Sequence, residues 1–295
     1  MKDIIKKYTC RLCNSKKLSR LFNLCKTPLA NNLAFNKNSS LIAKKFPLNL
    51  MICNSCKHVQ LEHVVNANNL YKKYFYMSGI SASFTKHFEN FANELSKNNK
   101  KTYKTKVLEI GSNDCTLLNF FKKNNCITVG IEPAKNLWIK TKYRHHIING
   151  FYNSKINNTL KKKYGFFDII VANNVFAHID NLKLVFNLLK KVMHQRTIIV
   201  VEISYLLDVI KKNLFDTIYH EHLDYHSIKP INQFLKSLDL KIINIKKLNI
   251  HGGSVRLYIT KTSNEFINNK KILNKLLQEE KNNGLYKKLT YKKFF

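Results

Sequence analysis

Between residues 106 and 203 the sequence alternates short apolar runs with segments whose apolar residues recur at helical spacing. Short apolar runs bounded by polar residues are typical of buried strands, whereas apolar residues three or four positions apart mark one face of a helix. The pattern predicts strands at 106–110, 127–132, 146–150, 166–174 and 197–203, and helices at 116–123, 134–142 and 182–193. This alternation is typical of an α/β fold, in which a parallel sheet carries helices on both faces.

Two further β-rich runs, at 240–249 and 254–261, are separated only by the segment IHGG. Strands joined by so short a connection pair antiparallel. Five parallel strands closed by such a hairpin fit the class I methyltransferase form of the Rossmann-like sheet better than the all-parallel sheet of dinucleotide-binding proteins. An aromatic segment, a helix at 87–95 and a polar, Lys- and Asn-rich linker at 96–106 precede this domain.

The N-terminal region carries two C-x-x-C pairs, Cys10 with Cys13 and Cys53 with Cys56. Each pair can place two thiolates on one tight turn, and two such turns supply the four ligands of a tetrahedral zinc site. A redox-active C-x-x-C is the alternative, but two copies without an adjacent βαβ pattern argue against it. Because four thiolates leave no open coordination position, we expect this zinc to stabilise the fold and to take no part in the chemistry.

Composition narrows the possible partners. The chain has 51 Lys and Arg residues against 18 Asp and Glu, a formal net charge of +33, but only five of the basic residues are Arg and the Lys residues are evenly spread. A phosphate-binding surface would gather its charge and use Arg for bidentate contacts, so we do not expect nucleic acid to be the partner. No apolar run has the length of a signal peptide core or a membrane helix, so we expect a cytoplasmic protein without a membrane partner.

The turn after the first predicted strand reads EIGSNDC, from Glu109 to Cys115. It contains a single glycine, Gly111, and so lacks the G-x-G-x-x-G fingerprint that cradles a dinucleotide pyrophosphate. A carboxylate that closes the first strand suits a ligand with an ammonium group, and Glu132 ends the second strand, where an acidic side chain can bind both ribose hydroxyls. We therefore predict an S-adenosylmethionine site formed by Glu109, Gly111, Ser112, Asp114, Glu132 and Asn173.

Several stretches of the chain resemble the zinc-binding sugar C-methyltransferases. They are the two Cys pairs, VLEIGSND, GIEPAKN, VANNVFAHIDN, VVEISYLLDVI, FDTIYHEHLDYHS and HGGSVRLYIT, in this order between residues 10 and 262. The resemblance implies a methyltransferase that uses S-adenosylmethionine to methylate a carbon next to the ketone of a nucleotide-linked keto sugar. It also implies a zinc-binding domain at 1–68, a connector and linker at 69–106, a cofactor-binding methyltransferase domain at 107–262, and the start of a truncated C-terminal domain at 263–295.

The chain departs from the family pattern at three places. The cofactor loop of the family normally reads GSNDG, and Cys115 stands here where a glycine would allow positive φ or close approach of the cofactor. Ser204 replaces the usual proline after the fifth strand. Family members continue into a second α/β half that helps to hold the sugar nucleotide, and we expect this sequence to lack that half.

The segment FDTIYHEHLDYHS, residues 215–227, is rich in groups that can transfer protons. Its spacing is not H-E-x-x-H, which argues against a metalloprotease; a metal site at His220, Glu221 and His222 and a purely structural role remain alternatives. Removing a proton alpha to a ketone requires a positioned base and hydrogen-bond donors for the enolate. By resemblance the catalytic group is Tyr219, Glu221 and His222, with His222 as base and Tyr219 as donor to the keto oxygen. Glu221 is then the orienter of His222 or a ligand of a sugar hydroxyl; alternatively, it is itself the base.

Further candidates flank this group. Asn174 and His178 follow the fourth parallel strand and match active-site positions of the family near the sugar, where we count His178 with the catalytic residues. Tyr76 is a candidate lid contact to the substrate, and His251 a candidate contact from the predicted hairpin turn; core packing and a plain turn are the simpler interpretations of these two. The rival classes are a zinc-ribbon nucleic-acid-binding protein, a nicotinamide oxidoreductase, and a truncated relative without catalytic activity.

Overall fold

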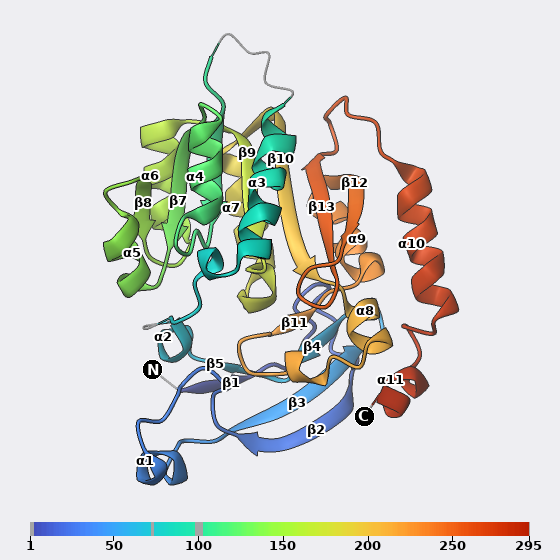
Figure 1. The fold of residues 1–295 in the computed structure, drawn as a ribbon. Helices are drawn as coiled ribbons and strands as arrows, with labels where there is room; N and C mark the ends of the chain where they lie inside the picture. The colour runs from blue at the N-terminus through green and yellow to red at the C-terminus, as the bar shows by residue number, and fades with distance from the viewer. Residues whose placement is uncertain (1–2, 72–73, 98–102, 295) are drawn as a thin grey trace.

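The centre of the molecule is a seven-stranded sheet with the strand order β12–β13–β10–β9–β6–β7–β8 (Figure 1). The computed structural model describes residues 3–71, 74–97 and 103–294, so the middle of the predicted linker, 98–102, lies outside the described residues. Strands β6 to β10 are parallel, and β13 pairs antiparallel with both β10 and β12. The predicted parallel sheet closed by a hairpin is therefore confirmed.

The elements of this domain follow the predicted alternation. The strands are β6 (Lys106–Ile110), β7 (Ile127–Glu132), β8 (His146–Asn149), β9 (Phe167–Asn173), β10 (Met193–Ser204), β12 (Leu240–Leu248) and β13 (Ser254–Lys261). The helices are α3 (Ala82–Ser96), α4 (Thr116–Lys123), α5 (Lys135–Thr141), α6 (Ser154–Tyr164), α7 (Leu182–Lys191), α8 (Leu206–Lys211) and α9 (Ile228–Lys236). Short 3-10 turns lie at η1 (Ser78–Ile80), η2 (Phe176–His178) and η3 (Phe215–Thr217). The sequence pattern alone does not predict α6, α8 or α9.

Side chains that alternate along the strands build an apolar layer on each face of the sheet. On β9, Ile169 and Val171 belong to the cluster that includes Phe121 of α4 and the aromatic face of α3. Ile170 and Ala172 point the other way, into the cluster built by α6, α7 and α9. Helices therefore cover both faces of the sheet, as predicted.

The N-terminal region forms β1 (Ile4–Lys6), β2 (Leu18–Thr27), α1 (Lys37–Leu41), β3 (Phe46–Cys53), β4 (Val59–Leu61), β5 (His63–Val65) and α2 (Ala67–Tyr71). Its main sheet is antiparallel, with the order β11–β4–β3–β2. Strand β11 (Asp224–Tyr225) comes from the segment 215–227, far along the chain. The segment that holds the predicted catalytic group thus contributes a strand to the N-terminal sheet (Figure 1).

The last two helices, α10 (Lys270–Asn282) and α11 (Lys288–Phe294), pack against the rest of the molecule. Helix α10 contacts α9 and β12, and α11 contacts β2 (Figure 1). The buried carboxylate of Glu280 accepts hydrogen bonds from the N–H groups of Ile228 and Lys229, at 2.5 and 3.2 Å, and so caps the N-terminus of α9. That residues 263–295 begin a further domain stays a prediction.

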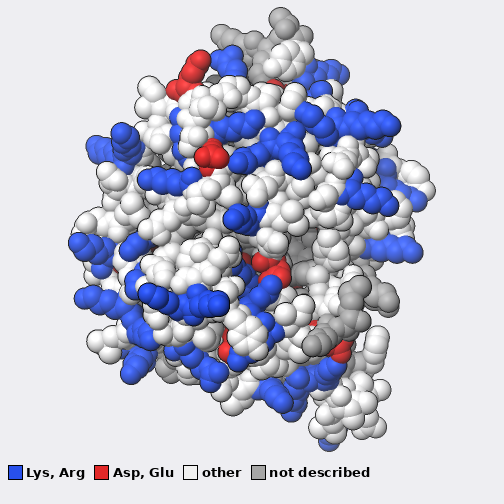
Figure 2. Space-filling view, turned by 180° about the vertical axis from the view of Figure 1, so that it is seen from behind, with Lys and Arg blue, Asp and Glu red and all other residues white. Residues whose placement is uncertain are grey.

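Positive charge is spread over the surface. On the face shown in Figure 2, Lys and Arg side chains occur over the whole area with a few carboxylates between them. This distribution gives a general positive field rather than one phosphate-binding patch on that face. Among the residues that the structure describes, none of the helices combines the length and apolar character of a membrane span.

Candidate active site and zinc centre

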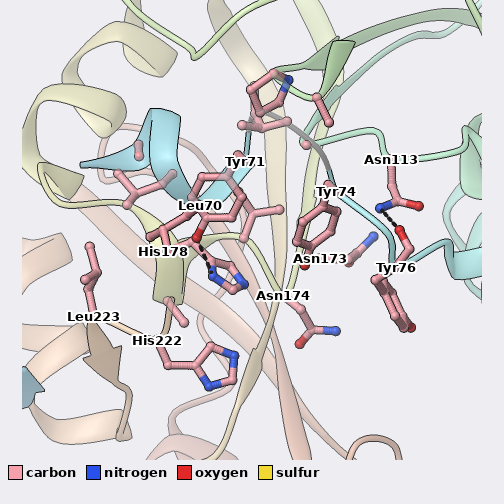
Figure 3. A pocket seen from close by; sticks show the side chains of 18 of the residues that line it. Leu70, Tyr71, Tyr74, Tyr76, Asn113, Asn173, Asn174, His178, His222 and Leu223 are labelled. Atoms are coloured by element: carbon pink, nitrogen blue, oxygen red, sulfur yellow. Dashed lines mark hydrogen bonds between the residues drawn. The ribbon is translucent and has the colours of Figure 1, made fainter. Parts of the chain in front are cut away.

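A cavity of about 670 Å³ lies at the carboxyl end of the parallel strands. The last residues of β6, β7, β9 and β10 line it, together with Tyr71, Tyr74 and Tyr76 and part of the N-terminal region. Ligands of open α/β sheets bind outside this edge, and the volume is typical of a small-molecule site. In Figure 3, Tyr71, His178 and His222 lie toward one side of the cavity, and Tyr76 and Asn113 toward the other.

Polar atoms in the cavity wall lack partners within the described part of the chain. They are Oε2 of Glu109, Oγ of Ser112 and both amide atoms of the Asn173 side chain. Because buried polar atoms are normally hydrogen-bonded, these atoms indicate a polar ligand. Burial, with smaller effects from Asp114 and Glu132, raises the pKa of Glu109 well above its ordinary value. A cationic ligand such as S-adenosylmethionine would stabilise the ionised carboxylate, so the residues fit this cofactor.

Glu132 lies at the end of β7 and organises the neighbouring loops. Its two oxygens accept hydrogen bonds of 2.7 Å from the N–H groups of Asn113 and Ala134. Each oxygen keeps a lone pair that can receive a ribose hydroxyl. Burial raises the pKa of Glu132 to about 7, although both N–H donors oppose this effect. Gly111 has φ of +70°, and a Cβ atom there would lie 2.6 Å from Cγ2 of Val175, so only glycine fits this turn.

The cofactor loop also holds the segment that leads into α3. Asn113 accepts a hydrogen bond from the N–H of Ser78 and donates one to the carbonyl of Tyr76, both at 3.0 Å. Asp114 accepts a 2.7 Å hydrogen bond from the N–H of Gly79. Asp114 does not line the cavity, so its contacts support a role in shaping the loop rather than in touching the cofactor.

Cys115 adopts φ of +64°, in the left-handed region, directly before α4. Glycine takes this conformation without steric cost, whereas a side chain strains it. Burial raises the pKa of the thiol to about 12, which keeps it protonated at neutral pH. The replacement of glycine therefore adds backbone strain to the loop but no reactive thiolate.

His222, the predicted base, lines the cavity. Its Nδ1 lies 2.8 Å from the carbonyl oxygen of Thr217; a carbonyl only accepts, so Nδ1 carries the hydrogen and Nε2 has the lone pair. The hydroxyl of Tyr219 donates to Nε2 at 3.0 Å. Burial lowers the pKa of His222 to about 4, so the ring is neutral at pH 7, as a general base must be.

His178 faces His222, with ring centres 5.1 Å apart. Its Nδ1 lies 2.9 Å from the carbonyl oxygen of Glu221 and 3.0 Å from the hydroxyl of Tyr71 (Figure 3). Burial, with a smaller effect of the His222 ring, lowers the pKa of His178 to about 3. The structure thus brings together two neutral histidines and Tyr219 from loops that are distant in sequence.

Glu221 occupies a different place from the one expected of an orienter. Both ring nitrogens of His222 are bonded to other residues, Nδ1 to the carbonyl of Thr217 and Nε2 to Tyr219. Its Oε1 accepts a 2.7 Å hydrogen bond from Nδ2 of Asn31, and burial raises its pKa. The hydrogen bonds therefore do not support Glu221 as the orienter of His222, because the main-chain carbonyl of Thr217 takes that position. The roles of sugar-hydroxyl ligand and of base stay predictions, and Oε2 of Glu221 is buried without a partner among the described residues.

The predicted substrate contacts lie at separate points of the cavity wall. Tyr76 is 47% exposed, and Asn174 follows β9 with φ of +53°. His251 lies in the turn between β12 and β13, with its ring centre 4.7 Å from that of Phe84. All three stay candidates for ligand contacts, and His251 does more than form a hairpin turn.

The four predicted zinc ligands come together at one point of the N-terminal region. The sulfur atoms of Cys10, Cys13, Cys53 and Cys56 all lie within 4.8 Å of one another, with Cys10–Cys56 and Cys13–Cys53 distances of 3.6 Å. A tetrahedron of Zn–S bonds of about 2.3 Å requires sulfur atoms about 3.8 Å apart, so the site fits zinc. Within the described residues this is the one cluster of His, Cys, Asp and Glu suited to a metal, and His220, Glu221 and His222 do not form a second.

The two cysteine turns have the same backbone form. The carbonyl of Cys10 accepts a hydrogen bond from the N–H of Asn14, and that of Cys53 one from Lys57, each at 2.9 Å. Asn14 and Lys57 have φ of +58° and +71°. Each turn presents its two thiolates to the same point, and this explains how two pairs of ligands with 39 residues between them in sequence reach one metal.

Comparison with known proteins gives the class. A family model described as "Putative zinc binding domain" matches residues 10–71, and one described as "Methyltransferase domain" matches residues 78–245, more than half of the chain. The chain belongs to the methyltransferase family. The sequence is 25% identical over 296 residues to the C-methyltransferase NovU of Streptomyces niveus, covering 100% of this chain and 70% of that protein. The resemblance to the zinc-binding C-methyltransferases, the use of S-adenosylmethionine and the structural zinc are thereby confirmed.

Two of the solved structures similar to this chain are a methyltransferase and a protein whose name gives no activity. The plantazolicin methyltransferase BpumL, solved with SAH, is 13% identical with a TM-score of 0.48, over 59% of this chain and 83% of that one. The PH0226 protein from Pyrococcus horikoshii OT3 is 14% identical with a TM-score of 0.49, over 65% of this chain and 98% of that one.

Several residues of the site escape prediction from sequence. Asn31 contacts Glu221 across 190 residues of sequence, and no local pattern marks it. Tyr71 and Tyr74 line the cavity beside Tyr76, and the density of aromatic residues in that segment is the signal that could have found them. Thr217 acts through its main-chain carbonyl, which the residue type does not reveal.

Proposed function

We propose that this enzyme methylates a carbon alpha to the ketone of a nucleotide-linked keto sugar. The observation that carries the proposal is the hydrogen bond of Tyr219 to neutral His222 in the cavity that also holds the cofactor residues. Abstraction of a proton alpha to a ketone needs such a base and such a donor. The sequence motifs and the C-methyltransferase among the relatives support carbon as the methylated atom.

The cofactor side of the cavity is assigned to residues at the ends of β6, β7 and β9. Glu109 binds the ammonium group, Glu132 the ribose hydroxyls, and Ser112 and Asn173 further polar atoms, while Gly111 allows close approach of the loop. When bound, S-adenosylmethionine supplies an electrophilic methyl group. The other residues of the cavity form the sugar side of the site.

His222 takes the proton in this mechanism. The C–H bond alpha to the ketone breaks, its proton goes to Nε2 of His222, and its electron pair forms the enolate. The bond from Nδ1 to the Thr217 carbonyl holds the ring and stabilises the imidazolium that results. The negative charge of the enolate raises the proton affinity of the ring, which offsets the effect of burial.

Tyr219 changes partner during this step. In the free enzyme its hydroxyl donates to Nε2 of His222. The keto oxygen competes for this donor once the sugar is bound, and the transfer of the hydrogen bond leaves the lone pair of Nε2 free for the proton. Asn174, His178, Tyr76 and His251 then contact the sugar or its nucleotide. Glu221 is less suited to be the base, because its side chain is bonded to Asn31 and does not line the cavity.

The test is a methyl-transfer assay with S-adenosylmethionine and a panel of nucleotide-linked keto sugars. We expect a product heavier by one methylene group, with NMR showing a new carbon–carbon bond next to the former ketone. Methylation at oxygen or nitrogen would contradict the reaction type. Cofactor binding without methyl transfer to any keto sugar in the panel would favour the alternative that this protein is a relative without catalytic activity.

A further inference from the structure

Arg11 stands between the first two zinc ligands, Cys10 and Cys13, yet its side chain points into the molecule. The side chain is only 2% exposed. Its main-chain N–H donates a 2.8 Å hydrogen bond to Oε1 of Gln60 in β4. A buried guanidinium carries a large desolvation cost, so its contacts indicate what it stabilises.

The guanidinium contacts both loops that carry the active-site histidines. Nη1 donates to the carbonyl oxygens of Leu61 at 2.8 Å and Leu223 at 3.3 Å, and Nε donates to Oδ1 of Asp180 at 3.3 Å. Leu223 directly follows His222, and Asp180 lies two residues after His178. Arg11, which lies between two zinc ligands, is therefore hydrogen-bonded to a residue close in sequence to each of the two histidines.

The loop that carries His178 and the loop that carries His222 are also hydrogen-bonded to each other beside the two histidines. The N–H of Leu223 donates to the carbonyl of Ala177 at 2.7 Å, and Nδ1 of His178 donates to the carbonyl of Glu221 at 2.9 Å. A shift of either loop therefore changes the separation of the two imidazole rings. Arg11 contacts this pair of loops from the side of the zinc centre.

Two other polar side chains of the N-terminal region each form a charged or polar contact with one of the loops. Lys7 pairs with Asp180 at 2.6 Å, and Nε2 of His58 lies 2.8 Å from Oδ1 of Asp224. The fork of Arg11 provides donors in two directions, which the single ammonium group of a lysine at the same place does not reproduce. Charge-assisted hydrogen bonds of this kind are also stronger than neutral ones.

We propose that Arg11 is a positioning residue that couples the zinc centre to the placement of His178 and His222. Zinc fixes the turn of Cys10 and Cys13, the turn fixes Arg11, and Arg11 holds the two loops at the distance that catalysis needs. The zinc would thus influence the reaction although it has no open coordination position. This inference rests on the proposed function for its effect on rate, but not for its effect on loop mobility.

The test compares Arg11→Lys and Arg11→Gln with the matched control Arg20→Gln. Arg20 lies in the same domain, is 52% exposed on its side chain and pairs with Glu62 rather than with either loop. Zinc per chain and cofactor affinity should be unchanged in all three variants. In the Arg11 variants kcat should fall by about 10- to 100-fold, the range typical of residues that orient a functional group through another, while KM changes little.

Amide hydrogen–deuterium exchange provides the readout that does not depend on substrate. Peptides that cover 177–180 and 219–225 should exchange faster in both Arg11 variants, and the peptide that covers 109–115 should not. Removing zinc from the wild type with a chelator should accelerate the same two peptides. In Arg11→Gln it should add little at 177–180, the peptide outside the N-terminal sheet, because the coupling is already lost.

The outcomes separate this inference from the proposed function. Unchanged exchange in 177–180 and 219–225 in both Arg11 variants would overturn the inference, even if the wild type is a keto-sugar methyltransferase. Loss of zinc together with activity in Arg11→Lys would also overturn it, since Arg11 would then serve metal retention alone. Faster exchange in an enzyme that methylates no keto sugar would support the coupling while refuting the proposed reaction.

Discussion

The hydroxyl of Tyr219 donates a 3.0 Å hydrogen bond to Nε2 of His222, the ring nitrogen that carries the lone pair. In the absence of substrate this bond occupies the atom that we expect to take the proton. The arrangement explains why a base whose pKa is lowered to about 4 by burial still has a defined orientation: both ring nitrogens are bonded. It also makes Tyr219 the natural donor to the keto oxygen.

Tyr219→Phe should lower the rate of methyl transfer by about 10²-fold or more, the usual cost of losing one donor to a developing oxyanion. Cofactor affinity should be unchanged, because Tyr219 is not among the residues that we assign to the cofactor. Tyr225→Phe is the matched control: this buried tyrosine reaches the Thr217 carbonyl only at 3.5 Å and does not line the cavity. Equal kcat values for the two variants would remove Tyr219 from the mechanism.

The parallel sheet could be predicted because its strands are buried on both faces and read as continuous apolar runs, such as IIVA in β9. Helix α6 escaped prediction because it is rich in Lys and Asn and buries little more than Ile156 and Leu160. Strand β11 escaped because it is only two residues long and pairs with β4, more than 160 residues away. Local periodicity carries no information about such a pairing.

Cofactor affinity should rise with pH around neutrality. The folded pKa of Glu132 is about 7, above the ordinary value of 4.5, so the carboxyl is partly protonated near pH 7 and its acceptor form becomes complete as pH rises. Binding of S-adenosylmethionine should therefore release protons, measurable by calorimetry in buffers of different ionisation enthalpy. Glu132→Gln should remove the contribution of this group to the pH dependence, leaving that of Glu109, and weaken binding by about 1–3 kcal/mol.

Glu89→Gln, a change at a surface position of α3, is the control for the Glu132 experiment and should bind the cofactor as the wild type does.

The contribution of Glu132 to the stability of the ligand-free protein should depend on pH in the opposite direction to cofactor affinity. The neutral Glu132 carboxyl stabilises the fold fully below pH 4.5, and this contribution is lost as pH rises through about 7. A wild-type affinity that is flat between about pH 6 and 8 would contradict the assignment of Glu132 to the cofactor.

Cys115→Gly and Cys115→Val should have opposite effects on the cofactor loop. Glycine relieves the strain of φ at +64° but removes a buried thiol, so the free energy of unfolding should change by less than about 1 kcal/mol, with cofactor affinity equal or improved. Valine, branched at Cβ, is much less compatible with this conformation and should lower both stability and affinity. Denaturant unfolding and calorimetry measure the two quantities. A valine variant as stable as the glycine variant would show that the loop does not require positive φ.

Purified protein should carry one zinc ion per chain. Cys53→Ser should lose the metal and destabilise the N-terminal sheet, because a structural zinc site contributes directly to folding. Cys25→Ser is the matched control, since Cys25 is exposed and lies outside the cluster, and it should keep the metal. Metal analysis after reducing, chelator-free purification checks both variants. Wild-type protein without zinc under these conditions would refute the site.

Which residues gather at the cavity was easier to predict than how their side chains are arranged. The family resemblance implies proton transfer by Tyr219, Glu221 and His222, but neighbours in a turn point in different directions, and sequence does not tell which one faces the cavity. Asn31 and Thr217, which hold Glu221 and His222, come from elsewhere or act through the main chain. The zinc ligands were predictable because four cysteines in two pairs have few other uses in such a chain.

The most direct test of the account is the exchange of the substrate hydrogen alpha to the ketone with deuterated solvent, followed by NMR without a methyl donor. The wild type should exchange this hydrogen, and His222→Asn should not, while it keeps the cofactor affinity of the wild type. Loss of exchange in Glu221→Gln alone would move the role of base to Glu221. Full exchange in His222→Asn would contradict the claim that His222 removes the proton.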